Sequence, residues 1–256
     1  MKRMIRIGII GGMSYESTLH YYKQINQEVY KRTHGLAFPD LAIRSVNFQE
    51  YRKLMRKGDW KRIGELLGGE AWELAYGFYC DYIAIATNTM HKVAGDIVRT
   101  VEGTPDFPFR RFDGFYPELV HIGDCIAEKC NEINAKKVLL LGTEFTMTED
   151  FMKARLKTHE IEAMDTSSYP KEIYKIDRII FEELCHGIVT PKSKKFMMNF
   201  VRQFLSDSEF KPDAIVLGCT ELNMILEPGD VDISLIDSTK AHIDKLVNLY
   251  LENSEV

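Results

Sequence analysis

The stretch Ala214-Ile215-Val216-Leu217-Gly218-Cys219-Thr220-Glu221-Leu222 decides the fold that the sequence predicts. Its apolar run is typical of a buried strand, and Gly218 gives the backbone room to turn at its end. Thr220 and Glu221 suit the first turn of a helix. Open α/β sheets place their chemistry at the carboxyl ends of their strands, so the thiol of Cys219 is a candidate catalytic group.

A second stretch has nearly the same build. Tyr82-Ile83-Ala84-Ile85-Ala86 runs into Thr87-Asn88-Thr89, and a helical segment follows from Met90. Thr87 therefore stands where the first stretch has Cys219. Two matching strand ends indicate one site that is approached from two sides.

Composition indicates an ordinary globular chain with a small-molecule partner. The chain has 256 residues, of which 45% are hydrophobic, enough for one large α/β domain or two of roughly 100 to 150 residues. A net charge of −5 and a pI near 5.9 argue against a nucleic acid held on a broad basic surface. No stretch is long and apolar enough to span a membrane, so we expect no membrane partner either.

The amino terminus and the cysteines predict a cytoplasmic location. The start Met1-Lys2-Arg3-Met4-Ile5-Arg6 is basic, but only a short apolar run precedes Gly8, Gly11 and Gly12, unlike a signal peptide. The five cysteines form an odd set without zinc-ligand spacing, which is typical of free thiols in a reducing compartment. We expect no metal site, and we take four of the thiols as inert core residues: Cys80, Cys125, Cys130 and Cys185.

A glycine turn follows the first predicted strand, Arg6 to Ile10. Ser14 is a candidate cap for a helix through Val29, which leaves the amides of the Gly11-Gly12-Met13-Ser14 turn available for an anion. The spacing is not that of a dinucleotide fingerprint, so we expect no nucleotide cofactor and favour a carboxylate. A tight turn with no ligand is the alternative interpretation.

Alternating strands and helices predict an α/β fold with parallel sheets that helices cover on both faces. The alternation breaks at residues 99–116, where glycines, prolines and aromatic residues indicate a long loop or a domain crossover. It then restarts, which predicts a first domain of residues 1–110 plus 224–256 and a second of residues 111–223. Two similar halves facing each other would place Thr87 and Cys219 in the cleft between them, a common place for ligands.

Six pieces of the chain, in order, resemble the aspartate/glutamate racemase family over almost the whole length. They are Gly8 to Ser14, Thr87 to His91, Leu141-Gly142-Thr143, Ile179 to Leu184, Leu217 to Leu222, and Ile236-Asp237-Ser238-Thr239. The resemblance implies an amino-acid racemase that needs no cofactor, with two pseudo-symmetric domains that each donate one acid/base residue to a site at their interface. A homodimer is a fair expectation for such an enzyme.

The chain departs from the family pattern in two places. Most members carry a second cysteine where this chain has Thr87, and the loop at 99–116 looks longer than the usual connection. A subgroup with threonine at the first position is similar, and it looks like racemases that act on acidic amino acids with a preference for the L form. Positions that match family cations for the substrate's distal carboxylate are Arg52 and, favoured here, Lys175, with Gln49 a weaker candidate from the same loop as Arg52.

The chemistry also follows from the residues themselves. A single base cannot readily reach both faces of a planar carbanion, so Thr87 and Cys219 are the predicted pair. The amino end of a helix after Cys219 would lower the pKa of its thiol and supply thiolate. Donors for the charge on the substrate carboxylate would be Asn88, Thr89 and Thr220 with their amides. We assign no proton transfer to His91 or His121, and to Glu221 only the start of a helix.

Two other classes of function stay open at this stage. A decarboxylase or isomerase of small diacids would need Cys219 without Thr87. A non-catalytic binding protein for an acidic amino acid would explain the missing second thiol.

Overall fold

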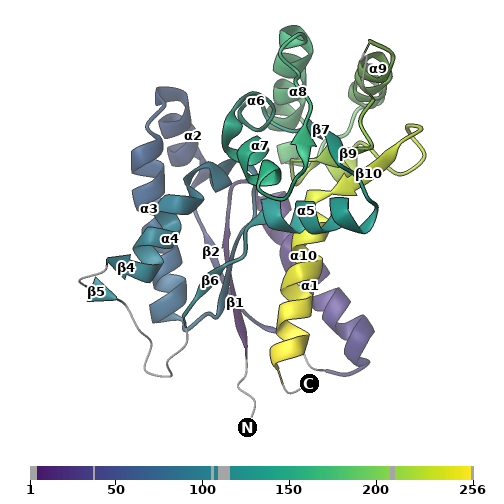
Figure 1. Cartoon of the computed structure of the whole chain (residues 1–256). Coiled ribbons are helices and arrows are strands. Elements are labelled where there is room, and N and C mark those ends of the chain that lie inside the picture. Colours follow the sequence, from purple (N-terminus) through teal and green to yellow (C-terminus); the bar gives the residue numbers. More distant parts are fainter. Residues whose placement is uncertain (1–4, 37, 105–106, 109–115, 208–210, 255–256) are drawn as a thin grey trace. The chain divides into compact units, whose positions relative to one another are not determined.

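The computed structural model describes residues 5–36, 38–104, 107–108, 116–207 and 211–254 (Figure 1). The chain divides into two compact units, residues 1–121 with 242–256, and residues 122–241. Each unit has its own four-stranded sheet, and every strand pair in these two sheets is parallel. The predicted fold class, an α/β fold with two parallel sheets, is confirmed.

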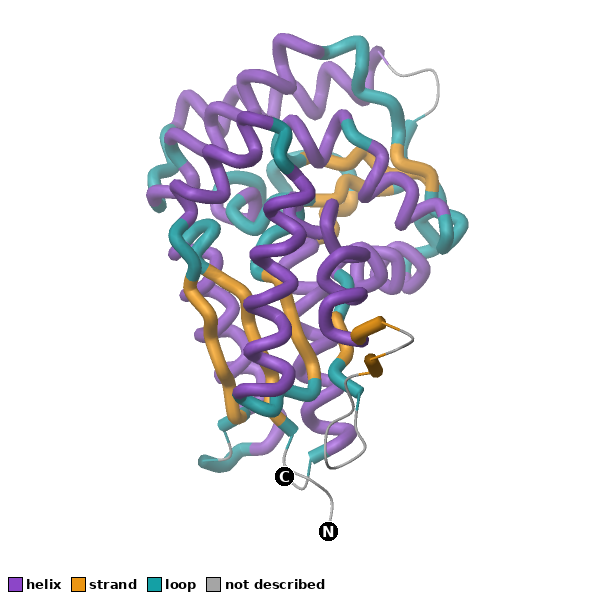
Figure 2. The backbone as a smooth tube through the Cα atoms, turned by 90° about the vertical axis from the view of Figure 1, so that its left-hand side faces the viewer, coloured by secondary structure: helices purple, strands orange, loops and turns teal. Residues whose placement is uncertain are grey.

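The first unit is built on a sheet in which β1 is an inner strand. The strand order is β2-β1-β3-β6, with β1 at Arg6–Gly11, β2 at Asp40–Ser45, β3 at Tyr82–Ile85 and β6 at Glu118–Leu119. The strands run alongside one another in the lower part of Figure 2. Because Ile7, Ile9 and Ile10 are buried, the middle of the sheet is covered on both faces, as the continuous apolar pattern predicts.

Helices flank this sheet on two sides (Figure 1). One group consists of α2 (Phe48–Lys57), α3 (Trp60–Trp72), the π-helical turn η1 (Glu73–Gly77), the 3₁₀ turn η2 (Thr89–Val93) and α4 (Ala94–Glu102). The other consists of α1 (Tyr15–Thr33) and α10 (Ser238–Asn253). A buried hydrogen bond of 2.8 Å between Tyr21 Oη and His242 Nδ1 joins these two helices. After α4 a short antiparallel pair follows, β4 (Gly103–Thr104) with β5 (Phe107–Pro108).

The second unit repeats this plan with the order β10-β9-β7-β8. Its strands are β7 (Lys137–Leu141), β8 (Glu162–Ala163), β9 (Ala214–Leu217) and β10 (Ser234–Asp237). Its helices and turns are α5 (Ile122–Glu132), α6 (Glu144–Thr148), α7 (Asp150–Lys157), α8 (Pro170–Glu182), η3 (Leu184–His186), α9 (Pro191–Asp207) and η4 (Leu222–Met224).

Alternate residues of β9 enter two separate cores, one on each face of the second sheet. Ile215 and Leu217 pack in a cluster with residues of α8 and α9. Ala214 and Val216 pack in a cluster with residues of α5 and α7. A strand that is buried on both faces must be apolar at every position, which explains the uninterrupted run before Gly218.

The chain crosses between the units at 121/122 and 241/242, later than the predicted boundaries after residues 110 and 223. Strand pairing is the physical reason for the difference. β6 pairs with β3, which keeps Glu118–Leu119 in the first sheet. β10 pairs with β9, which keeps Ser234–Asp237 in the second.

Two local predictions need correction. The segment after Cys219 forms only the short 3₁₀ turn η4 and not a regular helix. The segment 99–116 begins as the end of α4 and continues into β4. The aromatic residues Phe109, Phe112 and Phe115 of this segment lie outside the described residues. Of the helices in the described part of the chain, none has the length and apolar character needed to cross a membrane.

Candidate active site

The turn after β1 is too tightly packed for any residue but glycine at position 12. Gly12 has a φ of +87°, and a Cβ there would lie 2.3 Å from the carbonyl oxygen of Val46. Its N–H donates to Thr18 Oγ1 at 2.7 Å. Ser14 caps α1 by accepting a hydrogen bond from the N–H of Ser17 at 3.3 Å, as predicted. Met13 and Ser14 are both buried, so the turn is rigid and its position is fixed by the sheet.

The end of β3 is tied to this turn. Ser17 Oγ donates to the carbonyl oxygen of Ala86 at 2.8 Å, next to Thr87. The side chain of Thr87 is half-buried, while Asn88 and Thr89 are buried. His91 Nδ1 lies 2.9 Å from the carbonyl oxygen of Thr87, to which it donates. The backbone on both sides of Thr87 is therefore held in place.

The candidates after β2 lie on α2. Asn47 caps this helix by accepting from the N–H of Gln49 at 3.1 Å. Gln49 is exposed, and Arg52 is half-buried one turn further on. The loops after β1, β2 and β3 emerge at the same edge of a parallel sheet, so the structure brings the candidates of the first unit to one edge. They are Met13, Ser14, Gln49, Arg52, Thr87, Asn88 and Thr89.

In the second unit β7 and β9 approach each other closely at their carboxyl ends. The N–H of Gly218 donates to the carbonyl oxygen of Leu141 at 2.6 Å. A Cβ on Gly142 would lie 2.7 Å from the carbonyl oxygen of Gly218, and a Cβ on Gly218 would lie 2.8 Å from that of Leu141. The backbone that carries Cys219 is fixed by these contacts.

The thiol of Cys219 is buried and bonded to an acid. The side chain is 7% exposed, and Sγ donates to Oε2 of Glu221 at 3.0 Å. Burial is the largest cause that raises the pKa of this thiol well above its ordinary value, and the negative charge of Glu221 adds to it. The predicted lowering of this pKa is therefore wrong, because η4 is too short to present a helix amino end and a carboxylate faces the sulfur instead.

Glu221 and Cys185 are residues that sequence reasoning missed. Glu221 is 3% exposed and accepts from Thr220 Oγ1 at 2.7 Å as well as from Cys219. The prediction that Cys185 is an inert core residue does not fit the structure, because Cys185 is only half-buried and its Sγ lies 3.9 Å from Oε1 of the same carboxylate. A glutamate two residues after a candidate catalytic cysteine is a signal for the first residue, whereas no spacing in the sequence points to the second.

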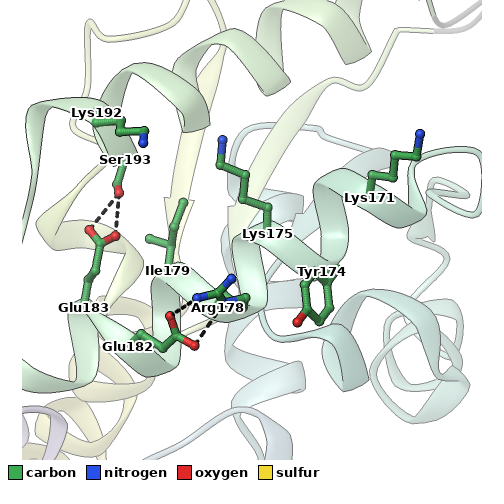
Figure 3. A pocket seen from close by; sticks show the side chains of 9 residues that line it. All are labelled: Lys171, Tyr174, Lys175, Arg178, Ile179, Glu182, Glu183, Lys192 and Ser193. Carbon is green, nitrogen blue, oxygen red and sulfur yellow. Dashed lines mark hydrogen bonds and ion pairs between the residues drawn. The ribbon is translucent and has the colours of Figure 1, made fainter.

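Lys175 lies in a pocket of about 420 Å³ between α8 and α9 (Figure 3). Its Nζ is 3.8 Å from the centre of the Phe196 ring, a cation–π contact. Two acidic side chains of the pocket wall accept hydrogen bonds from other residues that line the pocket. Glu182 accepts from Arg178 at 2.7 Å, and Glu183 accepts from Ser193 at 2.7 Å. Neither Cys219 nor Thr220 is among the residues that line this pocket.

The two sheets have equivalent strand orders. β1 lies between β2 and β3, and β7 lies between β8 and β9, with β6 and β10 at the far edges. β3 and β9 are therefore topological equivalents, and Thr87 and Cys219 follow them at matching positions. In the described part of the chain, no group of three or more histidine, cysteine, aspartate or glutamate side chains is arranged to hold a metal ion.

Several known proteins with similar sequences or structures are racemases or racemase homologues. The family model described as Asp/Glu/Hydantoin racemase matches residues 10–246. The broad specificity amino-acid racemase RacX of Bacillus subtilis is 22% identical over 250 residues, which cover 96% of this chain and 98% of that protein.

Two solved structures are similar over nearly their whole length. One is a Yersinia pestis protein proposed as an Asp/Glu racemase, with 32% identity, a TM-score of 0.80, and coverage of 97% of this chain and 100% of that chain. The other is the aspartate racemase homologue PH1733 of Pyrococcus horikoshii OT3, with 32% identity, a TM-score of 0.75, and coverage of 98% and 100%. Because the family model matches residues 10–246 and the two solved structures share the fold over nearly the whole chain, this chain belongs to the Asp/Glu/hydantoin racemase family.

Proposed function

We propose that this protein racemises acidic amino acids, aspartate or glutamate or both, without a cofactor, and that Cys219 and Thr87 are its two acid/base residues. The observation that carries the proposal is the equivalence of β3 and β9, since a side chain able to donate a proton follows two residues after the end of each strand. A two-base racemase needs one such group for each face of the planar carbanion. Membership in the racemase family favours this reaction over the decarboxylation or isomerisation of diacids.

The two groups differ in strength, so we propose that turnover is asymmetric. A threonine hydroxyl is a much weaker acid than a thiol, and its anion is scarce at neutral pH. Cys219 would then abstract the α-proton in the faster direction, and Thr87 would protonate the opposite face. The hydrogen bond from His91 to the Thr87 carbonyl oxygen supports a fixed position for that hydroxyl.

An acidic substrate needs a cation for its distal carboxylate. Lys175 and Arg52 are the proposed residues, and the turn amides at Met13 and Ser14 with Asn88, Thr89 and Thr220 are the proposed donors for the α-carboxylate. For Lys175 the support is the match to a family position, because neither Cys219 nor Thr220 lines the pocket that it shares with Lys171 and Lys192 (Figure 3). Lys175→Met and Arg52→Met should raise the KM for aspartate or glutamate while the KM for alanine, where turnover is measurable, stays unchanged.

Proton NMR in deuterated buffer, without added pyridoxal phosphate or metal, tests the reaction directly. Loss of the α-proton signal is followed for each enantiomer of aspartate and glutamate, and a chiral assay identifies the product. Exchange with formation of the mirror-image amino acid, abolished in Cys219→Ala, is the expected result. Folded protein that binds one of the four but exchanges no α-proton would contradict racemisation and indicate a binding protein.

The proposed assembly is a homodimer in the cytoplasm. Three large side chains on one stripe of α1 are exposed, Tyr15 at 59%, Leu19 at 58% and Tyr22 at 50%, which supports a contact with a second copy. All five cysteines are free thiols, which supports a reducing compartment. Light scattering should give twice the mass of the chain, and Leu19→Glu should give the mass of one chain. A monomeric wild type would contradict the dimer.

A further inference from the structure

Three donors from two segments of the second unit point to the carboxylate of Glu221. Oε2 accepts from the thiol of Cys219 at 3.0 Å and from Thr220 Oγ1 at 2.7 Å. The thiol of Cys185, on the turn η3 after α8, points to Oε1 at 3.9 Å. The acid is nearly enclosed, with 3% of its surface exposed. A carboxylate placed in this way costs desolvation free energy, which its hydrogen bonds offset.

The chemistry of a thiol base needs such a group. A cysteine takes a proton from carbon only as the thiolate, so the thiol of Cys219 must first lose its own proton. Burial holds that thiol in its neutral form, and little water reaches a side chain that is 7% exposed. The carboxylate of Glu221 is an acceptor in direct contact with this proton. Between a free thiol and a free carboxylate the transfer is unfavourable by about ten thousandfold, which a turnover step tolerates when the thiolate reacts at once.

We propose that Glu221 is the proton acceptor of Cys219, a role that rests on the proposed racemase function. In the abstraction direction the S–H bond of Cys219 breaks, an Oε2–H bond forms, and the electron pair stays on sulfur. The thiolate then forms a new S–H bond with the α-proton, and the electron pair of the broken Cα–H bond remains on the carbanion. Glu221 acts through Cys219 and does not need to touch the substrate, so it is a positioning residue.

Glu221→Gln separates this role from a structural one, because glutamine keeps the shape and loses both the charge and the ability to accept the proton. Alkylation of Cys219 by iodoacetamide is measured against pH by mass spectrometry of its peptide, and racemisation is measured in the same preparations. The alkylation midpoint should move to lower pH by at least one unit, since an adjacent negative charge is gone. Racemisation should nevertheless fall by about 100-fold or more, as expected on loss of a proton acceptor.

The proposal predicts that Glu221→Gln makes Cys219 easier to alkylate while it slows racemisation. If Glu221 only suppresses the thiolate, Glu221→Gln raises both alkylation and racemisation, and the proposal is wrong. If Glu221 has only a structural role, a folded Glu221→Gln variant keeps the racemisation rate of wild type, which also overturns the proposal. Glu227→Gln removes the same charge from an exposed position in the same loop and should change neither readout. Glu221→Asp, which restores a carboxylate one methylene shorter, should recover part of the racemisation.

The same experiment keeps the failure of this proposal apart from failure of the proposed function. An active wild type with an equally active Glu221→Gln variant refutes the role of Glu221 and leaves racemisation intact. A wild type that exchanges no α-proton refutes racemisation, and the alkylation profiles still decide whether Glu221 controls the thiol. Thermal unfolding of each variant shows whether the fold is kept. If Glu221→Gln does not fold, Glu221→Asp replaces it in the alkylation assay. An alkylation profile equal to that of wild type, together with full racemisation activity, supports the proposal only if a Glu221→Ala variant is inactive.

Discussion

His242 should make the first unit sensitive to acid. This histidine is fully buried on α10, where Nδ1 meets Tyr21 Oη at 2.8 Å and Nε2 lies 2.9 Å from the carbonyl oxygen of Val120. Because a carbonyl oxygen can only accept, Nε2 carries the proton of the neutral ring. Nδ1 then accepts the hydrogen bond from the tyrosine hydroxyl. A second proton on Nδ1 would make this nitrogen a donor, so the tyrosine hydroxyl could no longer donate to it. Burial, with a smaller effect of the nearby His91 ring, lowers the pKa of His242 from 6.5 to about 3.

The sign and size of the effect follow from linkage. A group whose pKa is lower in the folded state gives stability that is complete above the unfolded pKa of 6.5 and is lost as the pH falls toward about 3. Between pH 7 and pH 5 only the unfolded chain becomes protonated at this site, which costs about 2 kcal/mol of the free energy of unfolding. The complete loss, near pH 3, is about 5 kcal/mol.

Urea unfolding at pH 7 and pH 5 measures the loss of stability of the first structural unit, which contains His242. Both tryptophans, Trp60 and Trp72, are on α3 in the first unit, so their fluorescence reports on the part that contains His242. His242→Gln keeps a donor toward Val120 and cannot be protonated, so its loss between the two pH values should be smaller than that of wild type by about 2 kcal/mol. The exposed His186 lies in the other unit, and His186→Gln should behave as wild type. Equal pH dependence of wild type and His242→Gln would refute the reasoning.

Three other predictions test the packing and the site. Gly12→Ala should lower the free energy of unfolding in the same urea titration by about 3 kcal/mol, because it combines a positive φ with a Cβ 2.3 Å from the carbonyl oxygen of Val46. Gly58→Ala, at a positive φ with open space around it, should lower it by only about 1 kcal/mol. Phe200→Ala should cost about 3 to 5 kcal/mol by circular dichroism in urea, since Phe200 is buried with its ring centre 5.6 Å from that of Tyr169; less than 1 kcal/mol would contradict that packing. Thr87→Cys should raise racemisation of the poorer enantiomer severalfold in a chiral assay, because a thiol supplies far more base than a hydroxyl; an unchanged or lower rate in folded protein would count against the two-base role.

Strand positions were predictable where burial leaves only one interpretation. β7 and β9 occupy the residues expected from their apolar runs, Lys137 to Leu141 and Ala214 to Leu217, because a parallel strand is apolar wherever it is buried on both faces. The crossings between the units were not predictable in the same way. They depend on the pairing of β6 with β3 and of β10 with β9, and short strands of that kind carry no signal for the sheet that they join.

In the candidate site, as in the fold, features set by neighbouring residues could be predicted from the sequence and features set by distant residues could not. The positions of Thr87 and Cys219 follow from local patterns, since a strand end is encoded by the run that precedes it. The protonation of Cys219 does not, because its surroundings come from Glu221 two residues away and Cys185 on a different helix end. The expectation of a helix amino end favoured a thiolate, and the buried carboxylate favours a thiol. A thiol that starts protonated beside a carboxylate must be activated at the moment of reaction, so the rate should depend on Glu221 as well as on Cys219, and mutation of the cysteine alone would not reveal this dependence.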